Sequence, residues 1–117
     1  MNGMMQAVWY EANGGAAEVL VAGEMPVPSP MAGEVLVRLH ASGVNPSDVK
    51  ARAGSRPMGF PRVIPHSDGA GIIEAVGAGV DPAMVGTRVF VRNGQWRRAM
   101  GTAAQFIAID AGVLKIL

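Results

Sequence analysis

Two short segments of the chain place polar side chains directly after apolar runs. Residues 41–48 read Ala-Ser-Gly-Val-Asn-Pro-Ser-Asp, and residues 64–71 read Ile-Pro-His-Ser-Asp-Gly-Ala-Gly. Loops on a β-rich scaffold commonly present polar groups in this way at the mouth of a cleft. The two segments therefore predict polar side chains at the mouth of a cleft, as in a binding or catalytic site.

His66, followed by Ser67 and Asp68, suggests either a metal ligand or a general base. A zinc site takes three or four ligands, and His40 is the only other histidine of the chain. His40 falls within an expected strand, with no second ligand near it in the sequence. The pattern favours a hydrogen-bonded loop histidine, and we predict no metal site.

The serines and glycines of these segments have structural explanations. None of the serines lies in a Gly-x-Ser-x-Gly elbow, so turn and capping roles are favoured over a nucleophile. The Gly-Ala-Gly segments at 69–71 and 77–79 each begin a dinucleotide fingerprint, but Glu74 takes the place of the third glycine in the first and Pro82 ends the second. The sequence therefore contains no recognisable nucleotide-binding unit.

The apolar runs that must position these residues are short and rich in β-branched residues. Sixteen glycines and eight prolines in 117 residues argue against long helices and favour an all-β barrel or sandwich. The run 34–40 alternates as a strand does, with Val35, Val37 and Leu39 on one face and Leu36, Arg38 and His40 on the other. The expected strands are residues 7–10, 18–22, 34–40, 69–76, 87–91 and 103–109, and residues 92–101 are expected to form a surface loop.

Residues 46–52 are the helix candidate. Asn45 can cap this helix, Pro46 suits its first position, and Gly54 can end it. Asp48 would then lie in the first turn, where the helix dipole favours a carboxylate. For Asn45 and Asp48, this structural role competes on even terms with a functional one.

Composition excludes several functions. A net charge of +1 predicts no nucleic-acid partner, and no apolar run is long enough for a membrane span. The arginines between Arg52 and Arg98 are interpreted as a solvated rim in preference to an anion site. With no cysteines, disulfides and thiolate chemistry are excluded, which is compatible with a cytoplasmic protein.

Several motifs occur together in a familiar order: 33–37 (Gly-Glu-Val-Leu-Val), 41–48, 64–77, 86–90 (Gly-Thr-Arg-Val-Phe) and 101–106 (Gly-Thr-Ala-Ala-Gln-Phe). Through them, the chain from Met5 to Leu117 resembles the N-terminal GroES-like domain of the medium-chain dehydrogenase/reductase superfamily. Within the superfamily it is most similar to the zinc-free quinone oxidoreductase (zeta-crystallin-like) branch. The resemblance implies a mainly β fold, a partly open GroES-like barrel with one or two short helices.

The resemblance also has consequences for zinc. Zinc-dependent members carry a cysteine where Asn45 stands, a histidine where Ser67 stands and a glutamate where Asp68 stands. His66 takes the place of a glycine. Because both ligand positions are substituted, the resemblance implies an enzyme without zinc.

The cleft assignments follow from the resemblance as well. It implies NADPH in a cleft between two domains, with Asn45 and Asp48 as cofactor-binding residues. Val44, Lys50 and Ser67 would line the substrate cleft, where a quinone, an activated alkene or a carbonyl compound accepts hydride. Some relatives have tyrosine where Lys50 stands. No residue of this chain is assigned as catalytic.

Family enzymes continue into a Rossmann domain that holds most of the cofactor. Residues 1–117 are expected to form only the GroES-like domain, inactive alone and weak in NADPH binding, with the Rossmann domain absent from this chain. Two alternatives stay open: a free-standing barrel that acts as a binding or interaction module, and a divergent alcohol dehydrogenase. A homo-oligomer is compatible with each.

Overall fold

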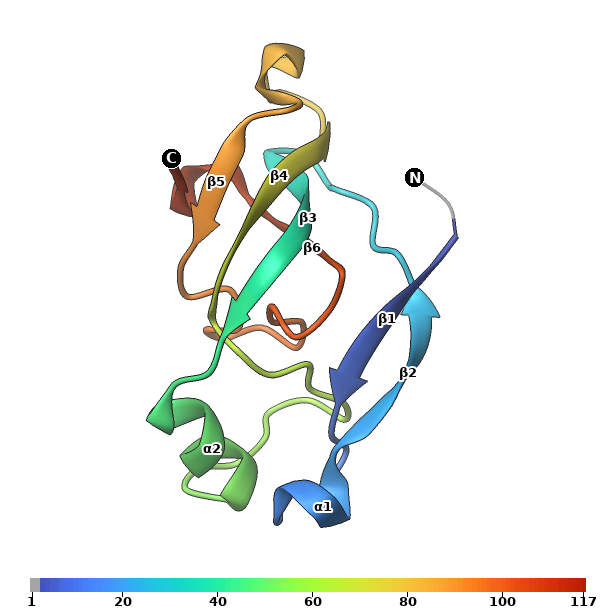
Figure 1. Cartoon of the computed structure of the whole chain (residues 1–117), viewed down its shortest axis with the longest axis vertical. Coiled ribbons are helices and arrows are strands. Elements are labelled where there is room, and N and C mark those ends of the chain that lie inside the picture. The colour runs from blue at the N-terminus through green and yellow to red at the C-terminus, as the bar shows by residue number, and fades with distance from the viewer. Residues whose placement is uncertain (1–2) are drawn as a thin grey trace.

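The computed structural model describes residues 3–117 and consists mainly of antiparallel strands (Figure 1). Five strands form one sheet in the order β6-β3-β4-β5-β7, and β1 pairs with β2 in a separate hairpin. The strands are β1 (Met4–Trp9), β2 (Val21–Pro26), β3 (Glu34–Gly43), β4 (Asp68–Val76), β5 (Arg88–Val91), β6 (Phe106–Asp110) and β7 (Leu114–Ile116). The helices are α1 (Ala16–Val19) and α2 (Pro46–Ala53), with 3₁₀ turns at Pro82–Met84 and Ala111–Val113. The prediction of a mainly β, partly open barrel with short helices is confirmed.

Strand β3 separates two apolar cores. Val35 and Val37 point into the core of the five-stranded sheet, and Leu39 packs at its margin, so the predicted alternation is confirmed. Leu36 points the other way and is also fully buried, because the β1–β2 hairpin covers that side of β3 (Figure 1). The first core contains Val35, Val37, Ile73, Val89, Val91, Ile107 and Ile109, and the second contains Met5, Ala7, Trp9, Val27, Leu36, Ile64 and Ala108.

The segment at 18–22 was expected to be a strand, and this prediction is wrong in its first half. Residues 16–19 form the single turn of α1, and β2 begins only at Val21. Ala16, Ala17 and Glu18 are good helix formers, and Gly14 and Gly15 before them allow the chain to turn. The strand then extends to Pro26, since pairing with Met4 of β1 continues to that residue.

Two further differences concern the C-terminal third. The strand expected at 103–109 begins at Phe106, because Ala103 and Gln105 instead bond to the backbone of β1. The short strand β7 was not predicted. Only three residues long and half exposed, it has too little alternation to be recognised, yet it pairs with β5 at the sheet edge.

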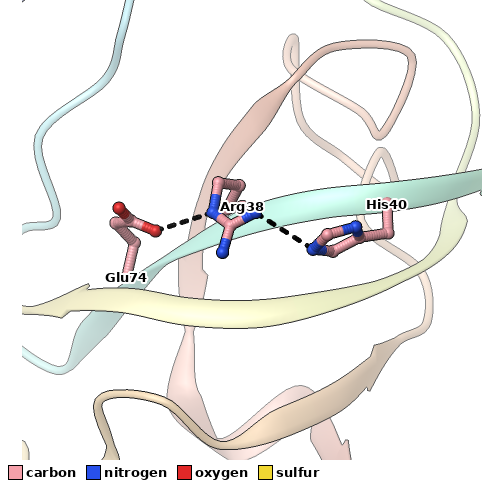
Figure 2. A network of polar contacts seen from close by, with 3 residues as sticks. All are labelled: Arg38, His40 and Glu74. Carbon is pink, nitrogen blue, oxygen red and sulfur yellow. Dashed lines mark hydrogen bonds and ion pairs between the residues drawn. The ribbon is translucent and has the colours of Figure 1, made fainter.

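The outer face of β3 and β4 carries a small polar network. Figure 2 shows Arg38 between Glu74 and His40. The Arg38 guanidinium donates from Nε to Glu74 at 2.9 Å and from Nη1 to His40 Nε2 at 3.1 Å. The Arg38 side chain is 43% exposed and the Glu74 side chain 34%. The ion pair between them therefore contributes little to stability, at most about 1 kcal/mol. Because arginine only donates, Nε2 of His40 is the acceptor.

The end of β3 approaches β4 closely and irregularly. The register shifts between Leu39 and Ala41, a bulge that leaves His40 unpaired and turns the strand. Gly71 lies opposite Leu39, and a Cβ atom there would collide with the main-chain oxygen of Arg38. The bulge and the close approach bring the end of β3 to the start of β4, where the polar segments meet.

Candidate functional site

The two polar segments recognised in the sequence are joined by hydrogen bonds. Gly43, the last residue of β3, pairs with Asp68, the first residue of β4. Just beyond, Asn45 Nδ2 donates to Asp68 Oδ2 at 2.9 Å. The side chains of Asn45 and Asp68 therefore form one unit at the base of α2.

Helix α2 holds Asn45 in place from the other side. The Asn45 main-chain N–H donates to Asp48 Oδ2 at 2.8 Å, and Asp48 is only 9% exposed. Pro46 opens the helix and Gly54, at φ 112°, ends it, as predicted. Asp48 thus acts on the loop backbone, and its observed contact is with Asn45.

A second hydrogen-bonded chain runs beside the first. The Thr102 hydroxyl donates to the main-chain oxygen of Asp68 at 2.7 Å. Ser42 Oγ lies 2.9 Å from Thr102 Oγ1 and 2.8 Å from His66 Nδ1. Thr102 is completely buried, and none of the buried side-chain polar atoms in residues 3–117 lacks a partner.

Counting protons along this chain fixes its direction. A carbonyl oxygen only accepts, so the single Thr102 proton is directed to Asp68, and Thr102 Oγ1 must accept from Ser42. Ser42 then has no proton left for His66, so His66 Nδ1 donates to Ser42. The neutral His66 ring therefore carries its proton on Nδ1 and has an electron pair on Nε2.

His66 is held in an unusual backbone conformation. Its φ of 76° lies in the left-handed region, which costs roughly 1–2 kcal/mol for a residue with a Cβ atom. Burial lowers the pKa of the imidazole, and the nearby Asp48 carboxylate partly opposes that effect. The neutral ring is thus favoured in the folded protein. The prediction of a hydrogen-bonded loop histidine agrees with the Ser42 contact.

Two depressions adjoin His66. The larger one, about 280 Å³, is lined by His40, Ser42, Thr102 and Gln105 among others. The smaller one, about 30 Å³, lies against Val44, Asp48 and Arg52. The smaller volume has room for one or two water molecules. His66 lines both depressions, so it lies between them.

Val44, Lys50 and Ser67, the residues predicted to line the substrate cleft, are not joined by hydrogen bonds in the way that Asn45, Asp48 and Asp68 are. Val44 is 63% exposed, and Lys50 projects from the exposed face of α2. Ser67 is half-buried, and its main-chain oxygen accepts from Gly94 N–H at 2.7 Å. Neither Lys50 nor Ser67 lines the two depressions beside His66.

Sequence reasoning missed Thr102 and the connection between Ser42 and His66. Thr102 stands in a recognised motif, and its position after Gly101 was the available signal. A Cβ atom at Gly101 would collide with main-chain oxygens of Pro65 and His66, so this glycine lets the 101–102 segment lie against the 64–66 segment. That approach places the Thr102 hydroxyl against the start of β4.

The described part of the chain contains no group of three or more His, Cys, Asp or Glu side chains placed to hold a metal ion. His40 and His66 line the same depression, although they are far apart in the sequence. Within residues 3–117, no helix is both long and apolar enough to cross a membrane.

Comparison with known proteins defines the class of this fold and site. Residues 31–116 match the family described as the alcohol dehydrogenase GroES-like domain. The chain belongs to this family, as the resemblance predicted.

Several of the similar proteins are named quinone oxidoreductases, and a putative zinc-dependent alcohol dehydrogenase from Rhizobium etli also superposes, with a TM-score of 0.84 at 31% identity over 97% of this chain and 33% of that one. The chain is 40% identical over 89 residues to quinone oxidoreductase of Rattus norvegicus, which covers 74% of the chain and 27% of the relative. It is 36% identical over 115 residues to quinone oxidoreductase of Homo sapiens, which covers 97% of this chain and 34% of the relative. A mycobacterial protein solved in complex with NADPH superposes with a TM-score of 0.82 at 30% identity, covering 97% of this chain and 34% of that one. The chain thus spans about a third or less of the curated relatives it matches.

Proposed function

We propose that the full-length protein containing this domain transfers hydride from NADPH to a quinone, an activated alkene or a related carbonyl compound, without zinc. The observation that carries the proposal is the similarity to human quinone oxidoreductase over 97% of the chain. The absence of zinc in the proposal rests on the residues at two positions where zinc-dependent members carry ligands. By the sequence resemblance Asn45 and Ser67 occupy those positions, and one N–H of the Asn45 amide donates to the Asp68 carboxylate.

The residues present fit one end of the cofactor. Val44 offers an exposed apolar surface beside the half-buried amide of Asn45, a combination suited to a flat ring that bears a carboxamide. The phosphates would need a glycine-rich turn at the N-terminus of a full helix. Helix α2 follows Asn45 and begins at Pro46, and α1, which does follow Gly14 and Gly15, is a single turn of four residues. The domain would therefore contact only the nicotinamide end, and a second domain would hold the rest.

In this proposal each residue has a physical task. When bound, NADPH supplies the hydride, and solvent supplies the proton that completes reduction of the acceptor. Val44 excludes water from the reacting face, and Asn45 contacts the carboxamide. Asp48 and Asp68 are positioning residues that hold the Asn45 backbone and side chain. Lys50 would lie at the rim of the substrate cleft, where a mobile cation replaces the aromatic side chain of some relatives.

The test is turnover by the full-length protein. Purified enzyme is mixed anaerobically with NADPH and either a benzoquinone or an α,β-unsaturated ketone, and the loss of NADPH and the reduced product are both quantified. We expect equal amounts of NADPH consumed and product formed with at least one acceptor. If no acceptor of either class is reduced, the proposal is contradicted.

A further inference from the structure

A cavity of about 340 Å³ lies between the loop after α2 and the loop after β5. Its lining includes Arg56 and Phe60 from the first loop, and Gln95, Trp96, Arg97 and Arg98 from the second. Residue types that bind flat anions thus meet there from segments about forty positions apart. None of the residues of the proposed hydride-transfer site lines this cavity.

The cavity lining includes three arginines and no carboxylate, whereas Glu34 and Asp110 line a neighbouring depression that shares Trp96 and Arg98 with it. Residues 49–67 and 82–109, the segments that contain the two loops, hold eight of the ten lysines and arginines and none of the nine acidic residues. Of these eight cations, only Arg62 makes an ion pair within residues 3–117, with Glu11. Arg56 and Arg97 therefore face the cavity without a carboxylate partner in the described part of the chain.

The second loop is held in a defined shape. Gln95 Nε2 donates to the main-chain oxygen of Arg98 at 2.9 Å, and Arg98 donates to the main-chain oxygen of Ala108 at 2.6 Å. Arg97 adopts φ 55° and places its guanidinium 4.4 Å from the centroid of the Trp96 ring. These contacts keep a cation and an aromatic face together at the rim of the cavity.

Arg98 is a half-buried cation that lines the cavity. Burial lowers the pKa of its guanidinium, and the opposing influence of Glu34 is smaller. Its nearest partners are main-chain oxygens of Ala108 and Met100, not a carboxylate. An anion in the cavity would therefore be stabilised by a cation that water screens only in part.

We propose that this cavity binds a compact aromatic oxyanion, an aryl carboxylate in which the ring lies against Trp96 and Phe60 and the oxygens face Arg56 and Arg97. Guanidinium groups match carboxylates through paired hydrogen bonds, and they stack on aromatic faces. Trp96 is 60% exposed and Phe60 37%, so a ligand ring would remove large apolar surfaces from water. The volume lies at the lower end for ligand cavities, which suits one or two fused rings and not a dinucleotide.

The experiment measures binding of three probes to the full-length protein by calorimetry. 2-Naphthoate carries both ring and charge, 2-naphthylmethanol carries the ring alone, and inorganic phosphate carries charge alone. We expect naphthoate to bind at least about tenfold more tightly than either other probe, because each of them loses one set of contacts. Equal binding of the neutral ring, or of phosphate, would overturn the proposal, as would absence of naphthoate binding.

A matched pair of variants places the site. Arg56→Gln with Arg97→Gln removes two cations from the cavity, and Arg88→Gln with Arg92→Gln removes two cations that do not line it. Net charge falls equally in both, so general attraction of anions is controlled. We expect about tenfold weaker naphthoate binding in the first pair and a change within about twofold in the second. Equal losses in the two pairs would assign binding to overall charge and refute the site.

Discussion

At the residue scale, the hydrogen bonds of the candidate site define one proton arrangement. The chain runs from His66 through Ser42 and Thr102 to the main-chain oxygen of Asp68. A parallel set links Asp48, Asn45 and Asp68. Side chains that separately suggested a metal ligand, a nucleophile or a cap thus act together to fix the loop between β3 and α2.

The first prediction concerns the protonation of His66. Because burial lowers its pKa in the folded state from the ordinary value of 6.5, the unfolded chain binds more protons just below that pH. The free energy of unfolding should therefore fall as the pH is lowered from about 6.5 towards the folded-state pKa. The variant His66→Asn, which tolerates positive φ, should lose this part of the slope in denaturant titrations between pH 5 and 7. The matched variant His40→Asn retains His66 and should keep the slope, so equal slopes in all three proteins would contradict the assignment.

The second prediction concerns the direction of the hydrogen-bonded chain. ¹⁵N NMR of the imidazole at neutral pH should show the proton of His66 on Nδ1. Thr102→Val removes the acceptor for Ser42, which can then donate to His66, so the tautomer should shift towards Nε2–H. The same variant should lower the free energy of unfolding by about 1–3 kcal/mol, because the main-chain oxygen of Asp68 loses its donor. A wild-type ring protonated on Nε2 would show that the chain runs the other way.

At the element scale, short strands with clear alternation could be predicted, and contacts between distant segments could not. The alternation of β3 and the caps of α2 are local, so the sequence indicated both. The edge strand β7 depends on its pairing with β5 and was missed. The turn of α1 was misassigned as strand, although its helix-forming residues and the glycines before it are local signals. The same distinction holds for the site. Asn45 and Asp48 could be found from their spacing, but the burial of Thr102 depends on Gly101 meeting the 64–66 segment.

The third prediction tests the close approach of β3 and β4. Gly71→Ala would place a Cβ atom against the main-chain oxygen of Arg38 and should lower the free energy of unfolding by about 1–3 kcal/mol. Gly43→Ala is the control, because a Cβ atom at Gly43 would meet only ordinary contacts, the nearest at 3.5 Å. Thermal or denaturant unfolding of both variants measures the difference. If both cost the same, the packing at Gly71 is looser than the structure shows.

The fourth prediction tests the cap that positions Asn45. Asp48→Ala removes the acceptor of the Asn45 N–H and should lower the free energy of unfolding by about 1 kcal/mol. Ser47→Ala, one residue earlier and exposed, should change it little. In the full-length protein, Asp48→Ala should also raise the KM for NADPH, whereas Ser47→Ala should not. A normal KM in the destabilised Asp48 variant would confine Asp48 to a structural role.

At the scale of the whole molecule, helix α2 and the loop before it lie at one end of the five-stranded sheet, beyond the end of β3 (Figure 1). The family and the relatives support the proposal that the full-length protein is a hydride-transfer enzyme, in which this domain would contribute one wall of the cleft. The sequence resemblance predicts that Asn45 and Ser67 stand where zinc-dependent members of the superfamily carry metal ligands. The central claim is therefore that the full-length protein uses NADPH without zinc.

One measurement tests that claim most directly. The full-length protein is dialysed exhaustively against a strong chelator, its zinc content is determined by mass spectrometry, and its NADPH-dependent quinone reduction is compared before and after. We predict unchanged turnover with zinc far below one equivalent per chain, and no gain when zinc is added back. Turnover that falls with the zinc content and returns with added zinc would contradict the account.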